Sequence, residues 1–176
     1  LKLCLDDELL SKKGPVSIED LISIWKKEEV LDGSNRYRCK NCNETTKSVK
    51  TLEISNAPSI LVTQIKRFEY TTKGKVRKLS KQVEFTDKLD INVDTLHGGA
   101  SLVTYNLKAV VSHIGDKISG GHYIATTRLD ASSDSWHTYS DSFCKAISSE
   151  QVQKQQAYLL FYEKDNIVRE EIEGGI

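Results

Sequence analysis

His122 stands directly behind two glycines, Gly120 and Gly121, in the segment SGGHYIATTR. The alternation that begins at Tyr123 is typical of a strand entering a core. The paired glycines indicate a tight loop whose backbone passes close to a neighbouring group. An imidazole at the junction of a loop and a rigid strand is well placed to transfer protons. A structural histidine at a turn explains this stretch, taken alone, equally well.

The four cysteines are the second set of residues that could do chemistry: Cys4, Cys39, Cys42 and Cys144. Two of them form a C-x-x-C motif, which supplies two thiolates of the four ligands that a structural zinc site needs. The other two lie far apart in the chain. Because nothing in the sequence indicates secretion, we favour free thiols or metal ligation over a disulfide framework.

Composition excludes several classes of partner. The chain has 176 residues, enough for one domain with a real core, and its 25 basic and 25 acidic residues give zero net charge. That balance shows no footprint of nucleic-acid or membrane binding, and no apolar run approaches the length of a membrane span. No signal-peptide pattern opens the chain. We expect an intracellular protein, cytoplasmic or nuclear, without nucleic-acid or membrane partners.

The start of the chain predicts that it is a piece of a longer protein. It begins with Leu1, contains no methionine, and opens on LKLCLDD, which already alternates like a strand in progress. We therefore expect that further sequence lies upstream.

The pattern along the chain predicts an α+β fold, mainly antiparallel β-sheet with few helices. A helix is expected over 17–25, where Ser17 and Asp20 form a capping box before an apolar stripe. A short helix is expected within 148–156, and the basic segment 71–82 is expected to form a hairpin tip or a mobile loop. Short links favour antiparallel pairing of the predicted strands, which lie near 1–7, 48–56, 59–70, 83–93, 105–115, 123–126, 135–141, 144–148 and 157–164.

The motifs C-x-x-C, SILVTQIKRFEY, YNLKAVVSHIGDKISGGHYIA, WHTYSD and AYLLFYEK occur in this order. Together they resemble the C-terminal half of the catalytic domain of the ubiquitin-specific proteases, papain-like cysteine proteases that remove ubiquitin. The resemblance covers residues 1–164. It implies fingers at about 1–58 and a palm at about 59–164, followed by a polar tail at 165–176. The family's nucleophile box, of the type N-T-C-Y/F, surrounds none of the four cysteines.

The resemblance implies a role for each residue around the histidine. His122 matches the family's GHY histidine and would act as general base toward a cysteine that is not in this chain. The family's orienting Asp or Asn, just after W-x-x-F/Y, aligns with Ser140, and Asp141 follows. Because neighbouring side chains on a strand point to opposite faces, Ser140 is favoured as the acceptor. Asp141 would then place a loop or polarise a water. Ser140 and Asp141 both stay candidates for the residue that orients His122.

Two loops and the cysteine pair complete the implied site. Segments 71–78 and 114–121 match the family's blocking loops, and Gly120, Gly121 and Tyr123 would wall the channel for the ubiquitin tail; ordinary hairpin loops are the alternative. The family's zinc uses a second C-x-x-C upstream. Cys39 and Cys42 would therefore be half of a zinc site, or else a remnant that no longer binds metal.

The resemblance thus implies a cysteine-type deubiquitinase (a thiol-dependent ubiquitinyl hydrolase). It would hydrolyse the isopeptide or peptide bond after the C-terminal glycine of ubiquitin, with ubiquitin and ubiquitinated proteins as partners. This chain alone would be inactive. The alternative is a catalytically inactive module that binds ubiquitin, and the presence of an upstream nucleophile box would decide between the two. A zinc-ribbon nucleic-acid module is disfavoured by the zero net charge and the missing second C-x-x-C.

Overall fold

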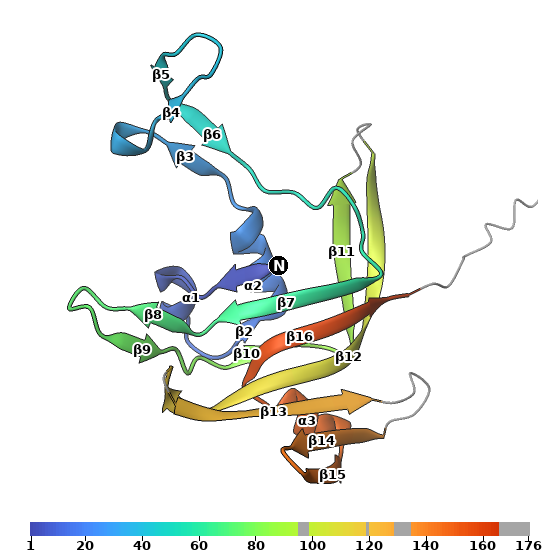
Figure 1. Cartoon of the computed structure of the whole chain (residues 1–176). Helices are drawn as coiled ribbons and strands as arrows, with labels where there is room; N and C mark the ends of the chain where they lie inside the picture. The colour runs from blue at the N-terminus through green and yellow to red at the C-terminus, as the bar shows by residue number, and fades with distance from the viewer. Residues whose placement is uncertain (95–98, 119, 129–134, 166–176) are drawn as a thin grey trace, which may run out of the picture.

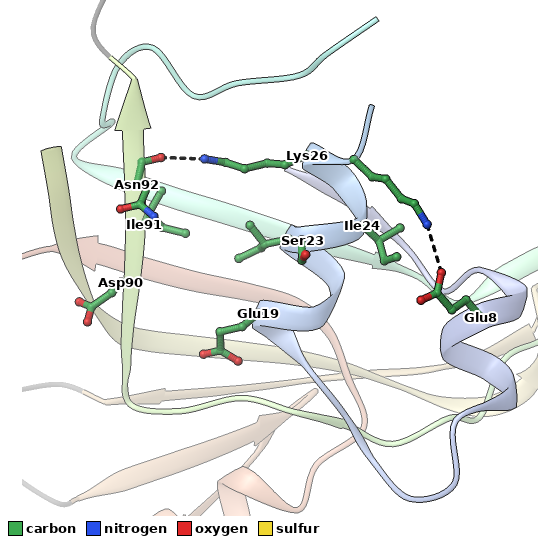
Figure 2. A pocket seen from close by; sticks show the side chains of 10 residues that line it. Glu8, Glu19, Ser23, Ile24, Lys26, Asp90, Ile91 and Asn92 are labelled. Atoms are coloured by element: carbon green, nitrogen blue, oxygen red, sulfur yellow. Dashed lines mark hydrogen bonds and ion pairs between the residues drawn. The ribbon is translucent and has the colours of Figure 1, made fainter. Parts of the chain in front are cut away.

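One large sheet organises the protein (Figure 1). The computed structural model describes residues 1–94, 99–118, 120–128 and 135–165. Within these ranges the strand order is β1–β7–β16–β12–β13–β14–β15, and β11 also pairs with β12. The strands are β1 (Lys2–Cys4), β7 (Ile60–Lys66), β11 (Lys88–Asp94), β12 (Ala100–Lys117), β13 (Gly120–Arg128), β14 (Trp136–Ser140), β15 (Phe143–Ile147) and β16 (Ala157–Lys164).

Four short ladders accompany the sheet in the described part of the chain. They pair β2 (Val16–Ser17) with β10 (Val83–Glu84), β3 (Glu29–Leu31) with β6 (Ser48–Lys50), β4 (Tyr37–Arg38) with β5 (Thr45–Thr46), and β8 (Phe68–Tyr70) with β9 (Val76–Lys78). A 3₁₀ turn spans Gly33–Asn35. Figure 1 shows β3–β6 and β4–β5 as an arm that projects away from the large sheet.

The α+β prediction is confirmed, with three helices beside mainly antiparallel strands among the residues that the structure describes. They are α1 (Asp7–Ser11), α2 (Ile18–Lys26) and α3 (Ser149–Gln153). The capping box at the start of α2 forms as predicted, since the Ser17 hydroxyl accepts from the Asp20 N–H. Helix α1 was not predicted. Its sequence signal is Asp6, whose carboxylate accepts from the Leu9 N–H as an N-cap.

Within the described ranges two strand pairs are parallel, contrary to the expectation that short links make every pair antiparallel. They are β1 with β7 and β2 with β10. In each pair the partners are far apart in the sequence, so the length of a local link places no limit on their direction.

Alternating burial along the strands builds the core. Strand β7 buries Leu61, Thr63 and Ile65, and β11 alternates in the same way. Helix α2 packs beside β1 with Leu21 fully buried. The division into fingers and palm stays a prediction. Of the predicted polar tail, only Asp165 falls within the described residues.

Arg67 holds the centre of this architecture together. Its side chain is almost fully buried at the end of β7, in the KRF motif. Nε donates to the carbonyl of Ala157 at 2.6 Å, and Nη1 donates to those of Leu79 at 3.1 Å and Lys81 at 2.9 Å. Burial lowers the pKa of the guanidinium to about 10, so it remains charged at neutral pH. Arg67 therefore joins β7, the start of β16 and the segment after β9.

We predict that Arg67→Met lowers the free energy of unfolding by about 3 kcal/mol or more. The substitution leaves three carbonyls without their donor, and a buried acceptor without a partner costs about 1–3 kcal/mol. Urea unfolding followed by fluorescence measures the change. The matched control is Arg77→Met, which removes an exposed ion pair with Glu69 and is expected to cost about 0–1 kcal/mol. Equal, small losses for both variants would contradict the bracing role of Arg67.

Candidate active site

Two antiparallel ladders place His122 beside Ser140. In the ladder between β13 and β14, Thr126 lies directly opposite Thr138, so their side chains share one face of the sheet. His122 and Ser140 lie on this same face because each is an even number of residues away along its strand. The result is a contact of 2.6 Å between His122 Nε2 and Ser140 Oγ.

Asp141 reaches the other ring nitrogen of His122. It is the first residue of the two-residue turn between β14 and β15, with a φ of +50°. Its Oδ2 lies 3.9 Å from His122 Nδ1, and its side chain is 87% exposed. Strict alternation would point Asp141 away from the face that carries Ser140. The strand ends at Ser140, however, and the left-handed backbone of the turn brings both side chains to the ring.

This geometry defines what the imidazole can do. In the tautomer with its proton on Nε2, that N–H donates to Ser140 Oγ and Nδ1 keeps a lone pair as a base. The Asp141 carboxylate lies beyond hydrogen-bond range of Nδ1, but its negative charge would stabilise the positively charged form of the ring. Its exposure weakens that effect because solvent screens the pair.

The ring of His113 lies so close to the backbone at position 121 that only a glycine fits there. A Cβ built at Gly121 would lie 2.1 Å from His113 Nε2 and 2.7 Å from the carbonyl oxygen of Ile114. At Gly120 a Cβ would meet nothing within 4 Å. The expectation that this backbone passes close to a neighbour is therefore confirmed at Gly121 alone. The ring of His113 sits against the residue that precedes His122.

His113 and Lys78 support the strand from behind. His113 is 5% exposed, and its ring makes edge contacts with those of Tyr123 at 4.8 Å and Phe68 at 5.4 Å between centroids. Burial, together with the ammonium of Lys78, lowers the pKa of His113 and keeps the ring neutral. Lys78 Nζ donates to the carbonyls of His113 and Gly115 at 2.8 Å each. Sequence reasoning assigned neither residue a role beside His122, since nothing in their local pattern marks one.

Lys78 joins the two segments predicted as blocking loops. It belongs to the 71–78 segment, which contains the turn between β8 and β9, while Gly115 lies in the 114–121 segment. Ser119, in the second segment, is outside the described residues. Tyr123 is 54% exposed and follows His122 on the strand, so the two rings point to opposite faces. The role of Gly120, Gly121 and Tyr123 as channel walls stays a prediction.

Cys39 and Cys42 lie on a tight knuckle between β4 and β5. The Cys39 N–H donates to the Glu44 carbonyl, and Asn43 adopts a φ of +60°. The Cys39 sulfur accepts from the backbone N–H groups of Cys42 and Asn41, which lowers the pKa of this thiol. A thiolate favoured in this way suits a zinc ligand. No group of three or more His, Cys, Asp or Glu residues within the described ranges could hold a metal. The role of Cys39 and Cys42 as half of a zinc site stays a prediction.

Comparison with known proteins agrees with this fold. Residues 24–162 match the family model described as ubiquitin carboxyl-terminal hydrolase. Ubiquitin carboxyl-terminal hydrolase 8 of Saccharomyces cerevisiae is 39% identical over 167 residues, covering 90% of this chain and 34% of the relative. Ubiquitin carboxyl-terminal hydrolase 21 of Mus musculus is 35% identical over 151 residues, covering 85% and 26%.

A solved structure shows the same architecture. The SAGA Ubp8/Sgf11/Sus1/Sgf73 DUB module bound to ubiquitin aldehyde contains a chain with a TM-score of 0.75 and 33% identity. The match covers 93% of this chain and 35% of that one. The fold thus matches that of ubiquitin-specific protease catalytic domains. The chain belongs to the ubiquitin carboxyl-terminal hydrolase family, as a ubiquitin-specific protease, and spans about a third or less of the relatives it matches.

We predict that Gly121→Ala lowers kcat/KM for a fluorogenic ubiquitin amide by about 100-fold in the full-length protein. The new Cβ would overlap the His113 ring, so β13 must shift and carry His122 with it. Misplacement of a reacting group by about 1 Å is worth about this factor. Gly120→Ala is the matched control for folding: its Cβ meets nothing within 4 Å, so its melting temperature should equal that of the wild type, whereas that of Gly121→Ala should fall. Equal effects of the two variants would refute this account of Gly121.

Proposed function

We propose that this chain forms part of a cysteine-type deubiquitinase and supplies its general base, His122. The observation that carries the proposal is the 2.6 Å contact between His122 Nε2 and Ser140 Oγ, which leaves Nδ1 available for proton transfer. Family membership supports the reaction class. The nucleophilic thiol would come from a cysteine elsewhere in the full-length protein, so the isolated chain would not turn over.

The proposed reaction proceeds through a thioester. His122 Nδ1 takes the thiol proton, and the thiolate attacks the carbonyl carbon of the C-terminal glycine of ubiquitin. The imidazolium then gives its proton to the leaving lysine amine as the carbon–nitrogen bond breaks. A water molecule, deprotonated by the same imidazole, hydrolyses the thioester and releases ubiquitin. Formation and hydrolysis of the thioester both need the ring in one orientation, which the hydrogen bond to Ser140 maintains.

We assign Ser140 and Asp141 different tasks. Ser140 orients the imidazole through Nε2 but brings no negative charge to the imidazolium. The carboxylate of Asp141, 3.9 Å from Nδ1, lies on the side where the proton arrives and leaves. It would stabilise the imidazolium through space or through a bridging water. This division keeps Nδ1 free as the base, which a direct hydrogen bond from Nδ1 to Asp141 would prevent.

The proposed partners are ubiquitin and ubiquitinated proteins inside the cell. Support comes from the related chain in the SAGA module, whose structure contains bound ubiquitin aldehyde. All four cysteines are free thiols, as expected in a reducing compartment. In the part of the chain that the structure describes, no helix has both the length and the apolar character needed to cross a membrane.

We also propose that the full-length protein carries zinc at the C-x-x-C knuckle. Cys39 and Cys42 would supply two thiolates, and two further ligands would come from outside this chain. The support is the backbone of the knuckle, whose N–H groups point at the Cys39 sulfur and lower the pKa of the thiol. Zinc would give the projecting arm a fixed shape, since structural zinc contributes directly to folding.

We predict that Ser140→Ala lowers kcat by about 10- to 100-fold with little change in KM, because the ring loses its orienting partner. Asp141→Asn should reduce kcat less, since its carboxylate is exposed. Initial-rate assays with a fluorogenic ubiquitin amide measure kcat and KM for both variants in the full-length protein. The control Ser142→Ala, in the same turn, should match the wild type. Turnover that survives His122→Ala would refute the base assignment.

The inactive-binder alternative has its own outcome in this assay. A wild-type protein that gives no turnover but binds ubiquitin in calorimetry would identify a ubiquitin-binding module. The neutral Ser140, where a carboxylate would stabilise the imidazolium, is the feature that favours this second candidate.

We predict that the full-length protein contains one zinc ion, and that Cys39→Ser or Cys42→Ser removes it. Elemental analysis after dialysis measures the stoichiometry. Cys4→Ser and Cys144→Ser are matched controls and should retain the metal, because these exposed thiols lie in strands of the large sheet. A wild-type protein without zinc would support the remnant alternative for this motif.

A further inference from the structure

Four side chains form a row across four neighbouring strands around His122. On one side, Ile114 of β12 lies directly opposite His122 of β13. On the other side, His122 contacts Ser140 of β14, and Ser140 lies directly opposite Phe143 of β15. Directly opposed residues of antiparallel strands point to the same face. The base and its hydroxyl partner therefore have an apolar side chain at each end of the row.

Both ends of the row are open to solvent. Ile114 is 55% exposed and Phe143 is 60% exposed. Farther along β14, on the same face, Trp136 is fully buried, so the face is covered at that end and open beside His122. Phe143 belongs to neither the buried core nor the partly buried residues packed on it, within the ranges that the structure describes. Its ring thus contributes little to folding and lies next to the reacting centre.

The two ends of the row face different parts of the substrate. Ile114 is the first residue of the 114–121 segment. This segment ends with Gly120 and Gly121, on the side predicted for the ubiquitin tail. Phe143 lies beyond His122 and Ser140, on the opposite side. Because the scissile bond must lie at His122 Nδ1, ubiquitin extends from one side of it and the leaving amine from the other.

Resting on the proposed function, we propose that Phe143 is a specificity-determining residue for the leaving group. Its ring packs against the methylene stem of the acceptor lysine, whose amine receives the proton from His122. Strands β13 and β15 are two strand spacings apart, about 10 Å. An extended lysine stem and a phenylalanine side chain bridge that span together. Burial of these methylenes, which do not react, raises the rate for lysine isopeptides.

The test compares two substrates in the full-length protein: ubiquitin joined to the lysine of a short peptide, and ubiquitin methylamide. Both release an alkylamine, but methylamine has no stem to reach Phe143. Phe143→Ser is expected to lower kcat/KM for the isopeptide by about 10-fold and to leave the methylamide value within about twofold, since contact with methylenes is worth about this factor. Phe143→Leu should keep most of the preference.

Leu102→Ser is the matched control for an exposed apolar side chain. Leu102 is 64% exposed in β12, twelve residues before Ile114, and its replacement should leave kcat/KM unchanged for both substrates. Thermal melts check that all variants fold. If Phe143→Ser lowers kcat/KM equally for both substrates, or for neither, the role of Phe143 is overturned while the deubiquitinase proposal stands. If the wild type cleaves neither substrate, the proposed function fails, and this inference fails with it.

Discussion

The position of His122 depends on the pairing of β13 with a strand on each side. The ladder to β12 fixes His122 opposite Ile114, and the ladder to β14 brings Ser140 within hydrogen-bond distance of the ring. A slip of one residue in either ladder would turn the imidazole to the other face of the sheet. Backbone hydrogen bonds far from the ring would therefore decide whether His122 can act as the proposed base, and the side chains around it refine its orientation.

Two cations secure this register from inside the fold. Arg67 donates to three carbonyls on two segments, the start of β16 and the stretch after β9, and Lys78 donates to two carbonyls of β12 just before the chain turns into β13. A cation that binds backbone carbonyls restrains the path of the chain whatever the side chains are, because every residue carries the acceptor. His113 adds shape, since its ring fills the space that Gly121 leaves open. His113 and Lys78 thus support β13 from the face opposite to the one that carries the His122 ring.

In the proposed enzyme, the chemistry is divided between this chain and the rest of the protein. This chain would supply the base, its orienting hydroxyl and half of a zinc site, and the remainder would supply the thiol and the other ligands. Such a division makes the relative placement of the two parts a condition for activity. It also explains why the geometry around His122 is complete on the side of Nε2 and open on the side of Nδ1.

The sequence alone determined the fold class and the family, because periodic strands and short motifs can be recognised along the chain, and it predicted His122 as the base. It also predicted the α2 cap, since Ser17 and Asp20 lie within one turn. Tertiary structure decided that β1 pairs in parallel with β7, and that Asp141 reaches the histidine ring despite the alternation rule. It alone showed the row from Ile114 to Phe143. Such contacts join residues far apart in the chain, and long-range register leaves no trace in a local pattern.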